Sequence, residues 1–177
     1  MLEACHERVQ RTLALLGRLR AHLGQQGSDE SARQAARDVL RYFDMAAPLH
    51  HQDEELHVFP PLLAQGAPAV VALVQRLLQD HQHMVADWAA ARRPLQAVAD
   101  GQASAFSAAD EAVLERFALR YARHIEDEEG VAYPAVQGLW APEALAPMGR
   151  EMAARRHSPR AEAVRPAQPP ARSRAAP

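Results

Sequence analysis

Two segments of the chain share one frame of histidine, glutamate, aromatic and proline residues. The first segment, HHQDEELHVFP, covers residues 50–60, and the second, HIEDEEGVAYP, covers residues 124–134. His50 corresponds to His124, Glu54 to Glu128 and Phe59-Pro60 to Tyr133-Pro134, always 74 residues apart. His6 and His81 repeat at a similar distance of 75 residues. The chain therefore contains two similar halves, and we expect each half to form one helical hairpin.

The composition agrees with helices throughout. Alanine, leucine, arginine, glutamate and glutamine are plentiful, and aromatic residues make up only 5% of the chain, which favours helix over strand. The length of 177 residues allows one domain with a hydrophobic core. Leucine spacing, caps and prolines predict helices over about 3–24, 28–59 with a kink at Pro48, 67–99, 107–129, and a short helix within 142–156. Short connections make neighbouring helices antiparallel. We expect an all-α, up-down-up-down four-helix bundle in residues 1–156, followed by a disordered basic tail, rich in proline, alanine and arginine, in residues 157–177.

Charge and cysteine content limit the possible partners and location. The net charge of −2 gives no global field that would attract nucleic acid or a membrane, so we expect neither as a partner. The single cysteine, Cys5, excludes an intrachain disulfide, and we expect a small buried apolar role for it. The first ten residues lack the apolar run of a signal peptide, and no stretch approaches the roughly 18 apolar residues of a spanning helix. We expect a soluble, cytoplasmic protein.

The spacing of the repeated residues predicts a metal site. Residues i and i+4 of a helix lie about 40 degrees apart around the axis, so His50 shares a face with Glu54, and His124 with Glu128. The intervals from His6 to His50 and from His81 to His124 are 44 and 43 residues, as expected if each hairpin goes up and returns to the same level. Four imidazoles and two carboxylates would then meet in the core, where a cation satisfies them most directly. Such nitrogen and oxygen ligands suit iron, manganese or zinc.

These features together resemble the hemerythrin-like, HHE cation-binding domains. The resemblance rests on a first-helix histidine, the HHxxEExxxFP-like segment, a third-helix histidine preceded by an acid in QDHQHM, and the HIxxEExxxYP-like segment. The segment EMAARRH at 151–157 is also similar to the short closing helix of many members. The resemblance therefore covers about residues 3–156. It implies two non-haem iron ions joined by an oxo or hydroxo group. Glu54 and Glu128 would bridge them, and the terminal ligands would be His6, His50, His81 and His124.

One departure from the family bears on reactivity. Oxygen-carrying hemerythrins have a fifth histidine four residues after the first on their third helix, where this chain has Val85. Two roughly octahedral irons need about twelve bonds. Two bridging carboxylates, one bridging oxo or hydroxo group and four histidines together supply all but about two of them, which leaves about two positions for water or substrate. That openness favours reaction with oxygen, peroxide or nitric oxide, or sensing of them, over reversible oxygen storage. A peroxide- or nitric-oxide-consuming oxidoreductase and a structural zinc or manganese bundle remain alternatives.

Other residues near the frames are expected to orient ligands, to lie near the surface or to end helices. His50 is preferred to His51 as a ligand because position 51 aligns with Ile125. Glu55 and Glu129 are expected to be exposed or to accept hydrogen bonds from ligand imidazoles. Three aspartates could orient ligands or lie on solvated helix faces: Asp53, Asp80 and Asp127. Four histidines are expected at the surface or at the rim of the bundle: His22, His57, His83 and His157. Two aromatic-proline pairs are expected to end helices and plug the bundle: Phe59-Pro60 and Tyr133-Pro134.

Overall fold

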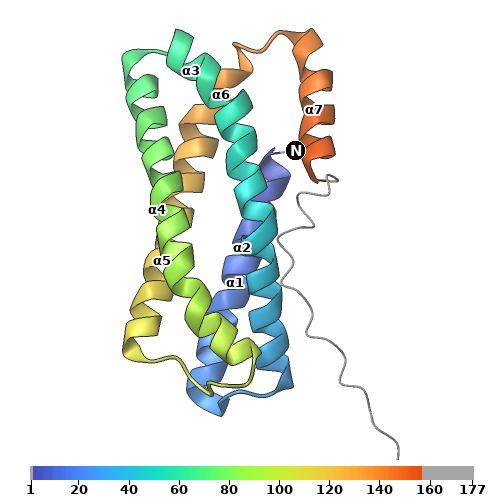
Figure 1. Cartoon of the computed structure of the whole chain (residues 1–177). Coiled ribbons are helices and arrows are strands. Elements are labelled where there is room, and N and C mark those ends of the chain that lie inside the picture. The colour runs from blue at the N-terminus through green and yellow to red at the C-terminus, as the bar shows by residue number, and fades with distance from the viewer. Residues whose placement is uncertain (1, 157–177) are drawn as a thin grey trace, which may run out of the picture.

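Four long antiparallel helices form the body of the molecule (Figure 1). The structure is a computed structural model that describes residues 2–156. The long helices are α1 (Leu2–Gln26), α2 (Glu30–His57), α4 (Pro68–Ala99) and α5 (Ala108–Asp127). Helix α2 packs against α1 and α4, and α4 packs against α5. The described residues contain no strand. The prediction of an all-α, up-down-up-down bundle is confirmed, whereas the predicted tail at 157–177 lies outside the described residues.

Capping side chains begin two of the long helices. Asp29 precedes α2, and its carboxylate accepts a hydrogen bond from the backbone N–H of Ala32 at 2.7 Å. Ser107 precedes α5 and forms a capping box with Asp110, because each side chain accepts a hydrogen bond from the backbone of the other residue. Pro48 and Pro94 lie inside α2 and α4 without ending them.

The two aromatic-proline pairs begin short helices that the sequence analysis did not predict. Phe59-Pro60 opens α3 (Phe59–Gln65), and Tyr133-Pro134 opens α6 (Tyr133–Gln137). Proline is tolerated in the first turn because the N–H that it lacks would have no partner within the helix there. Between α5 and α6, one π-helical turn, η1 (Glu128–Ala132), carries the chain past the predicted end at residue 129. Helix α7 (Pro142–Arg156) matches the predicted short C-terminal helix.

Two apolar clusters fill the bundle and leave a polar layer between them. One cluster includes Phe43, Leu95 and Phe117, and the other includes Phe59 and Leu77. Along α2, α4 and α5, the repeated histidines and glutamates occur between residues of the first cluster and residues of the second. The polar layer is therefore closed off by apolar side chains on both sides along the bundle axis.

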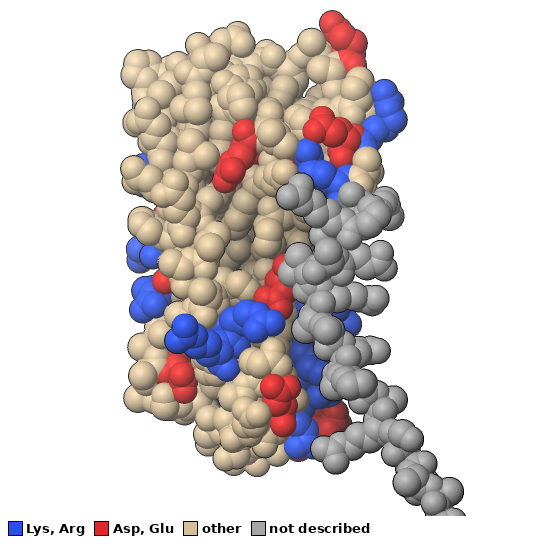
Figure 2. Space-filling view, viewed as in Figure 1, with Lys and Arg blue, Asp and Glu red and all other residues tan. Residues whose placement is uncertain are grey.

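The end of the bundle that carries α3 is poor in charge. Between Glu55 and Arg76 the sequence contains no lysine, arginine, aspartate or glutamate. Figure 2 shows this as a mostly uncharged area over α3 and the start of α4, whereas charged side chains gather farther down the same face.

Candidate metal site

The four long helices bring their repeated histidines to one level. Helix α1 supplies His6, α2 supplies His50 and Glu54, α4 supplies His81, and α5 supplies His124. Glu128 is the first residue of the π-helical turn that follows α5. Each of the six side chains is at most 4% exposed. The structure thus brings together all the residues that the sequence analysis selected as candidate ligands.

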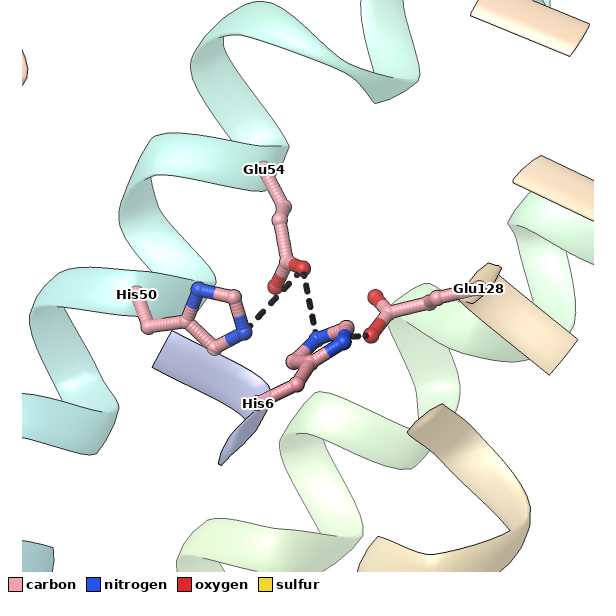
Figure 3. A group of neighbouring side chains, drawn as sticks. All are labelled: His6, His50, Glu54 and Glu128. Atoms are coloured by element: carbon pink, nitrogen blue, oxygen red, sulfur yellow. Dashed lines mark ion pairs between the residues drawn. The ribbon is translucent and has the colours of Figure 1, made fainter. Parts of the chain in front are cut away.

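These six residues form two overlapping groups of four. Donor atoms of His6, His50, Glu54 and Glu128 lie within 4.8 Å of one another, and Figure 3 shows these side chains pointing toward a common centre. The same limit holds for the second group, which consists of Glu54, His81, His124 and Glu128. Both carboxylates belong to both groups, whereas each histidine belongs to one.

The distances show how each carboxylate faces both pairs of histidines. Glu54 Oε1 lies 3.3 Å from His50 Nε2, and its Oε2 lies 3.6 Å from His81 Nε2. Glu128 Oε2 lies 3.1 Å from His6 Nε2, and its Oε1 lies 3.0 Å from His124 Nε2. In each glutamate, one oxygen faces the pair His6 and His50, and the other faces the pair His81 and His124. This is the arrangement of a carboxylate that spans two centres.

The layer holds more polar atoms than the described protein satisfies. Five buried side-chain atoms have no hydrogen-bond partner within residues 2–156: His50 Nδ1, Glu54 Oε2, His124 Nδ1 and both oxygens of Glu128. A buried carboxylate without hydrogen bonds is costly unless a cation compensates it. The donor set, imidazole and carboxylate without thiolate, suits iron, manganese or zinc, so these residues fit a metal.

The second glutamate of each frame orients a histidine of the other half. Glu129 Oε1 lies 2.9 Å from His6 Nδ1, and Glu55 Oε1 lies 2.8 Å from His81 Nδ1. An Nδ1–H that donates to a carboxylate leaves the lone pair of Nε2 facing the centre of the site, as a metal ligand requires. Of the two alternatives predicted for Glu55 and Glu129, exposure or a hydrogen bond from a ligand imidazole, these contacts agree with the second. The exchange between halves reflects the internal repeat.

Burial and the two carboxylates shift the pKa values of the site in opposite directions. Burial alone would lower the pKa of His6, but the carboxylates of Glu128 and Glu54 that face its Nε2 outweigh burial and raise the pKa to about 10. Burial, reinforced by the neighbouring His124, lowers the pKa of His81 to about 3. Burial, followed by repulsion from Glu128, raises the pKa of Glu54 well above its ordinary value. Burial alone would raise the pKa of Glu128, but the facing imidazoles of His124 and His6 outweigh burial and lower the pKa. His6 and Glu128 therefore favour their charged forms, whereas burial favours the neutral forms of His81 and Glu54.

Tyr133 also reaches into the site, contrary to the expectation that it only plugs the end of the bundle. Its hydroxyl donates to Glu54 Oε1 at 2.5 Å and lies 3.1 Å from His6 Nε2, and its ring stacks on the ring of His6 with 5.2 Å between centroids. The π-helical turn explains this position, because the backbone N–H of Tyr133 bonds the carbonyl of Glu128, five residues earlier. Tyr133 therefore stands one turn above Glu128.

His51 is a second residue that the sequence analysis left out of the site. It is buried, its ring stacks on that of His81 with 4.0 Å between centroids, and its Nε2 lies 3.5 Å from the Tyr121 hydroxyl. It belongs to neither four-residue group. The available signal was its i, i+3 relation to Glu54, which places both on neighbouring faces of α2. Val85, at the position of the fifth histidine, is 69% exposed.

The three neighbouring aspartates have other partners. Asp53 is completely buried and pairs with Arg155 at 2.9 Å and Arg156 at 2.6 Å on α7, so neither the orienting nor the solvated interpretation holds for it. Asp127 pairs with Arg76. Asp80 Oδ2 lies 3.9 Å from His124 Nδ1, while its other oxygen accepts a hydrogen bond from Arg120.

A comparison with protein families agrees with this geometry. The family model described as the hemerythrin HHE cation binding domain matches residues 1–136, from α1 through most of α6. The chain belongs to this family. This hemerythrin-like protein is also 35% identical, over 156 residues and 88% of each chain, to a Haemophilus influenzae protein described only as uncharacterized. Within residues 2–156 of the hemerythrin-like bundle, no helix is both long and apolar enough to cross a membrane.

Proposed function

We propose that this hemerythrin-like domain binds two iron ions and that it binds, senses or reacts with oxygen, nitric oxide or reactive oxygen species. The observation that carries the proposal is the overlap of the two four-residue groups at Glu54 and Glu128. A mononuclear site needs one group of donors. Two groups that share both carboxylates favour two ions joined by bridging glutamates.

Each residue would have a distinct part in holding the metals. His6 and His50 would hold one ion, His81 and His124 the other, and Glu54 and Glu128 would join them. Glu129 and Glu55 keep the rings of His6 and His81 in the orientation that presents Nε2. Bound iron would supply one-electron redox chemistry and positions open to a small ligand.

The surroundings support a small reactant. Apolar clusters lie on both sides of the polar layer, and the layer itself is buried, so a bulky substrate could not reach it without opening the bundle. The Tyr133 hydroxyl, which contacts Glu54 and His6, is a group outside the six that could donate a hydrogen bond to a ligand in the site. A diatomic molecule or peroxide satisfies these limits of size.

The test begins with iron-loaded, reduced protein prepared without oxygen. Oxygen, nitric oxide or peroxide is then added to separate samples, and the absorption spectrum is recorded. We expect stoichiometric spectral changes that are absent from Glu54→Ala/Glu128→Ala. The matched control is Glu115→Ala/Glu126→Ala, which removes two exposed glutamates of α5. An iron-loaded wild-type protein that reacts with neither molecule, nor with peroxide, would contradict the proposal.

The same experiment separates a binding protein from an enzyme. Reversible, stoichiometric binding without turnover indicates a carrier or sensor. Sustained consumption of peroxide or nitric oxide that is lost in Glu54→Ala/Glu128→Ala indicates an oxidoreductase.

A further inference from the structure

A cavity of about 280 Å³ lies beside the site, between the start of α1, helix α6 and helix α7. Figure 1 shows α7 standing alongside the bundle, with the start of α1 near its last turn. The α7 wall consists of Leu145, Met148, Gly149 and Met152, whose spacing places them on one face of the helix. Polar side chains on the wall, Glu3 and Gln137, are exposed, so they stand where the cavity meets water.

Tyr133 is common to the cavity and to the site. Its side chain lines the cavity, and its hydroxyl lies within hydrogen-bond distance of Glu54 and His6. The side chain is only 5% exposed. One side of the Tyr133 side chain therefore faces a space open to solvent, and its hydroxyl contacts the buried donor atoms.

Helix α7 is held firmly enough to maintain this space. Arg155 and Arg156, in its last turn, pair with the completely buried carboxylate of Asp53 on α2. Trp140, which also lines the cavity, donates a hydrogen bond from Nε1 to the carbonyl of His57 at 3.1 Å. Both contacts join the outer wall to the end of α2, close to Glu54.

We propose that this cavity is the chamber through which an uncharged diatomic molecule, oxygen or nitric oxide, reaches the metal site past Tyr133. The proposal rests on the proposed function, and it restricts the reactants to uncharged diatomic molecules. The inner wall of leucine, methionine and tryptophan side chains favours an apolar guest, and it would impose a desolvation cost on a charged one such as superoxide.

Filling the chamber tests the route. Gly149→Leu adds a side chain in the middle of the lining face, and a Cβ at this position meets no atom within 4 Å, so the backbone can accept it. The matched control is Ala154→Leu, an exposed position about half a turn around α7. In iron-loaded, reduced protein, stopped-flow absorption should show nitric oxide binding several-fold more slowly to Gly149→Leu than to the wild type or to Ala154→Leu, with equal iron content. Equal rates in the three proteins would overturn the proposal.

A second measurement needs no metal. Xenon, an apolar probe of similar size, should bind saturably to the metal-free wild type and to Ala154→Leu in xenon NMR titrations, and Gly149→Leu should lose this binding. Absence of xenon binding in the wild type would overturn the chamber whatever the metal does. If xenon binds as expected but the wild type takes up no iron, the proposed function fails while the apolar guest site stands.

Discussion

At the scale of single residues, the site depends on contacts one step away from the candidate ligands. Glu129 and Glu55 each accept a hydrogen bond from the Nδ1 of a histidine in the other half, at 2.9 Å and 2.8 Å. Both carboxylates are partly exposed, with side chains 43% and 45% accessible. They therefore hold the two imidazole rings from the solvent-facing side of the site.

These two contacts give a prediction about metal affinity. Glu55→Gln/Glu129→Gln should weaken metal binding by about 10- to 100-fold, because a neutral amide oxygen accepts from the Nδ1–H groups of His6 and His81 more weakly than the carboxylate that it replaces. Competition with a chelator of known affinity measures the change. Glu115→Gln/Glu126→Gln, with two exposed positions on α5, is the control. Equal affinity in the two double variants would show that the contacts do not orient ligands.

The sequence predicted the six candidate ligands but not the role of Tyr133. The i, i+4 pairs and the matched hairpin lengths were enough to place the six, because α-helical geometry is regular. Tyr133 depends on a π-helical turn at Glu128–Ala132, which adds one residue to the turn and brings Tyr133 over Glu128. The corresponding turn in the first half is α-helical, since the Val58 N–H bonds the Glu54 carbonyl. The two halves therefore differ where the repeat suggested that they were alike.

At the scale of elements, ion pairs attach the last turn of α7 to the bundle. Asp53 is completely buried, while Arg155 and Arg156 are 18% and 25% exposed. The sequence contained no signal for this pairing, because Asp53 sits among other acids and its partners lie about one hundred residues away.

Because the carboxylate is more deeply buried than the arginines, removing the arginines should lower the free energy of unfolding more than neutralising Asp53 does. Arg155→Ala/Arg156→Ala should lower the free energy of unfolding by about 3–5 kcal/mol, because it leaves a buried carboxylate without a cation. Asp53→Asn should cost less, since the freed guanidinium groups can turn to water. Urea unfolding of the metal-free proteins gives the values, with exposed Arg150→Ala as control. A double variant as stable as Arg150→Ala would contradict this account of how α7 is held.

Helices α4 and α5 are also joined by charge, in a way that depends on pH. Asp87 on α4 accepts hydrogen bonds from Arg116 at 2.9 Å and Arg120 at 2.8 Å on α5. Burial alone would raise the pKa of Asp87, but the two arginines outweigh it and hold the pKa below its usual value. A carboxyl whose pKa is lower in the folded state stabilises it above the unfolded pKa, and this contribution disappears as the pH falls through the folded pKa.

Asp87→Asn should therefore lower the free energy of unfolding by roughly 1–3 kcal/mol at neutral pH. The difference from the wild type should begin to shrink as the pH falls below about 4, because the unfolded chain then binds a proton at Asp87, and it should vanish once the pH falls through the lower folded pKa and native Asp87 is protonated too. Urea unfolding across a pH series measures both quantities. A difference that is constant with pH would show that charge at Asp87 does not join the two helices.

At the scale of the whole molecule, the internal repeat and the apolar clusters together produce the site. Two hairpins of nearly equal length bring four histidines and two glutamates to one level, and Phe43, Leu95 and Phe117 on one side and Phe59 and Leu77 on the other exclude water from it. The overall architecture was predictable from hydrophobic spacing and helix signals. The cavity beside α7 was not, because it depends on how a helix beyond the repeat packs against the bundle.

The most direct measurement is the metal content of protein purified without a metal-binding tag. We expect about two irons per chain in the wild type, and their loss in His50→Ala/His124→Ala, since each half of the site loses one imidazole. His22→Ala/His83→Ala, which removes two histidines outside the site, should keep both irons. One zinc per chain, or no metal in any of the three proteins, would contradict a dinuclear iron site.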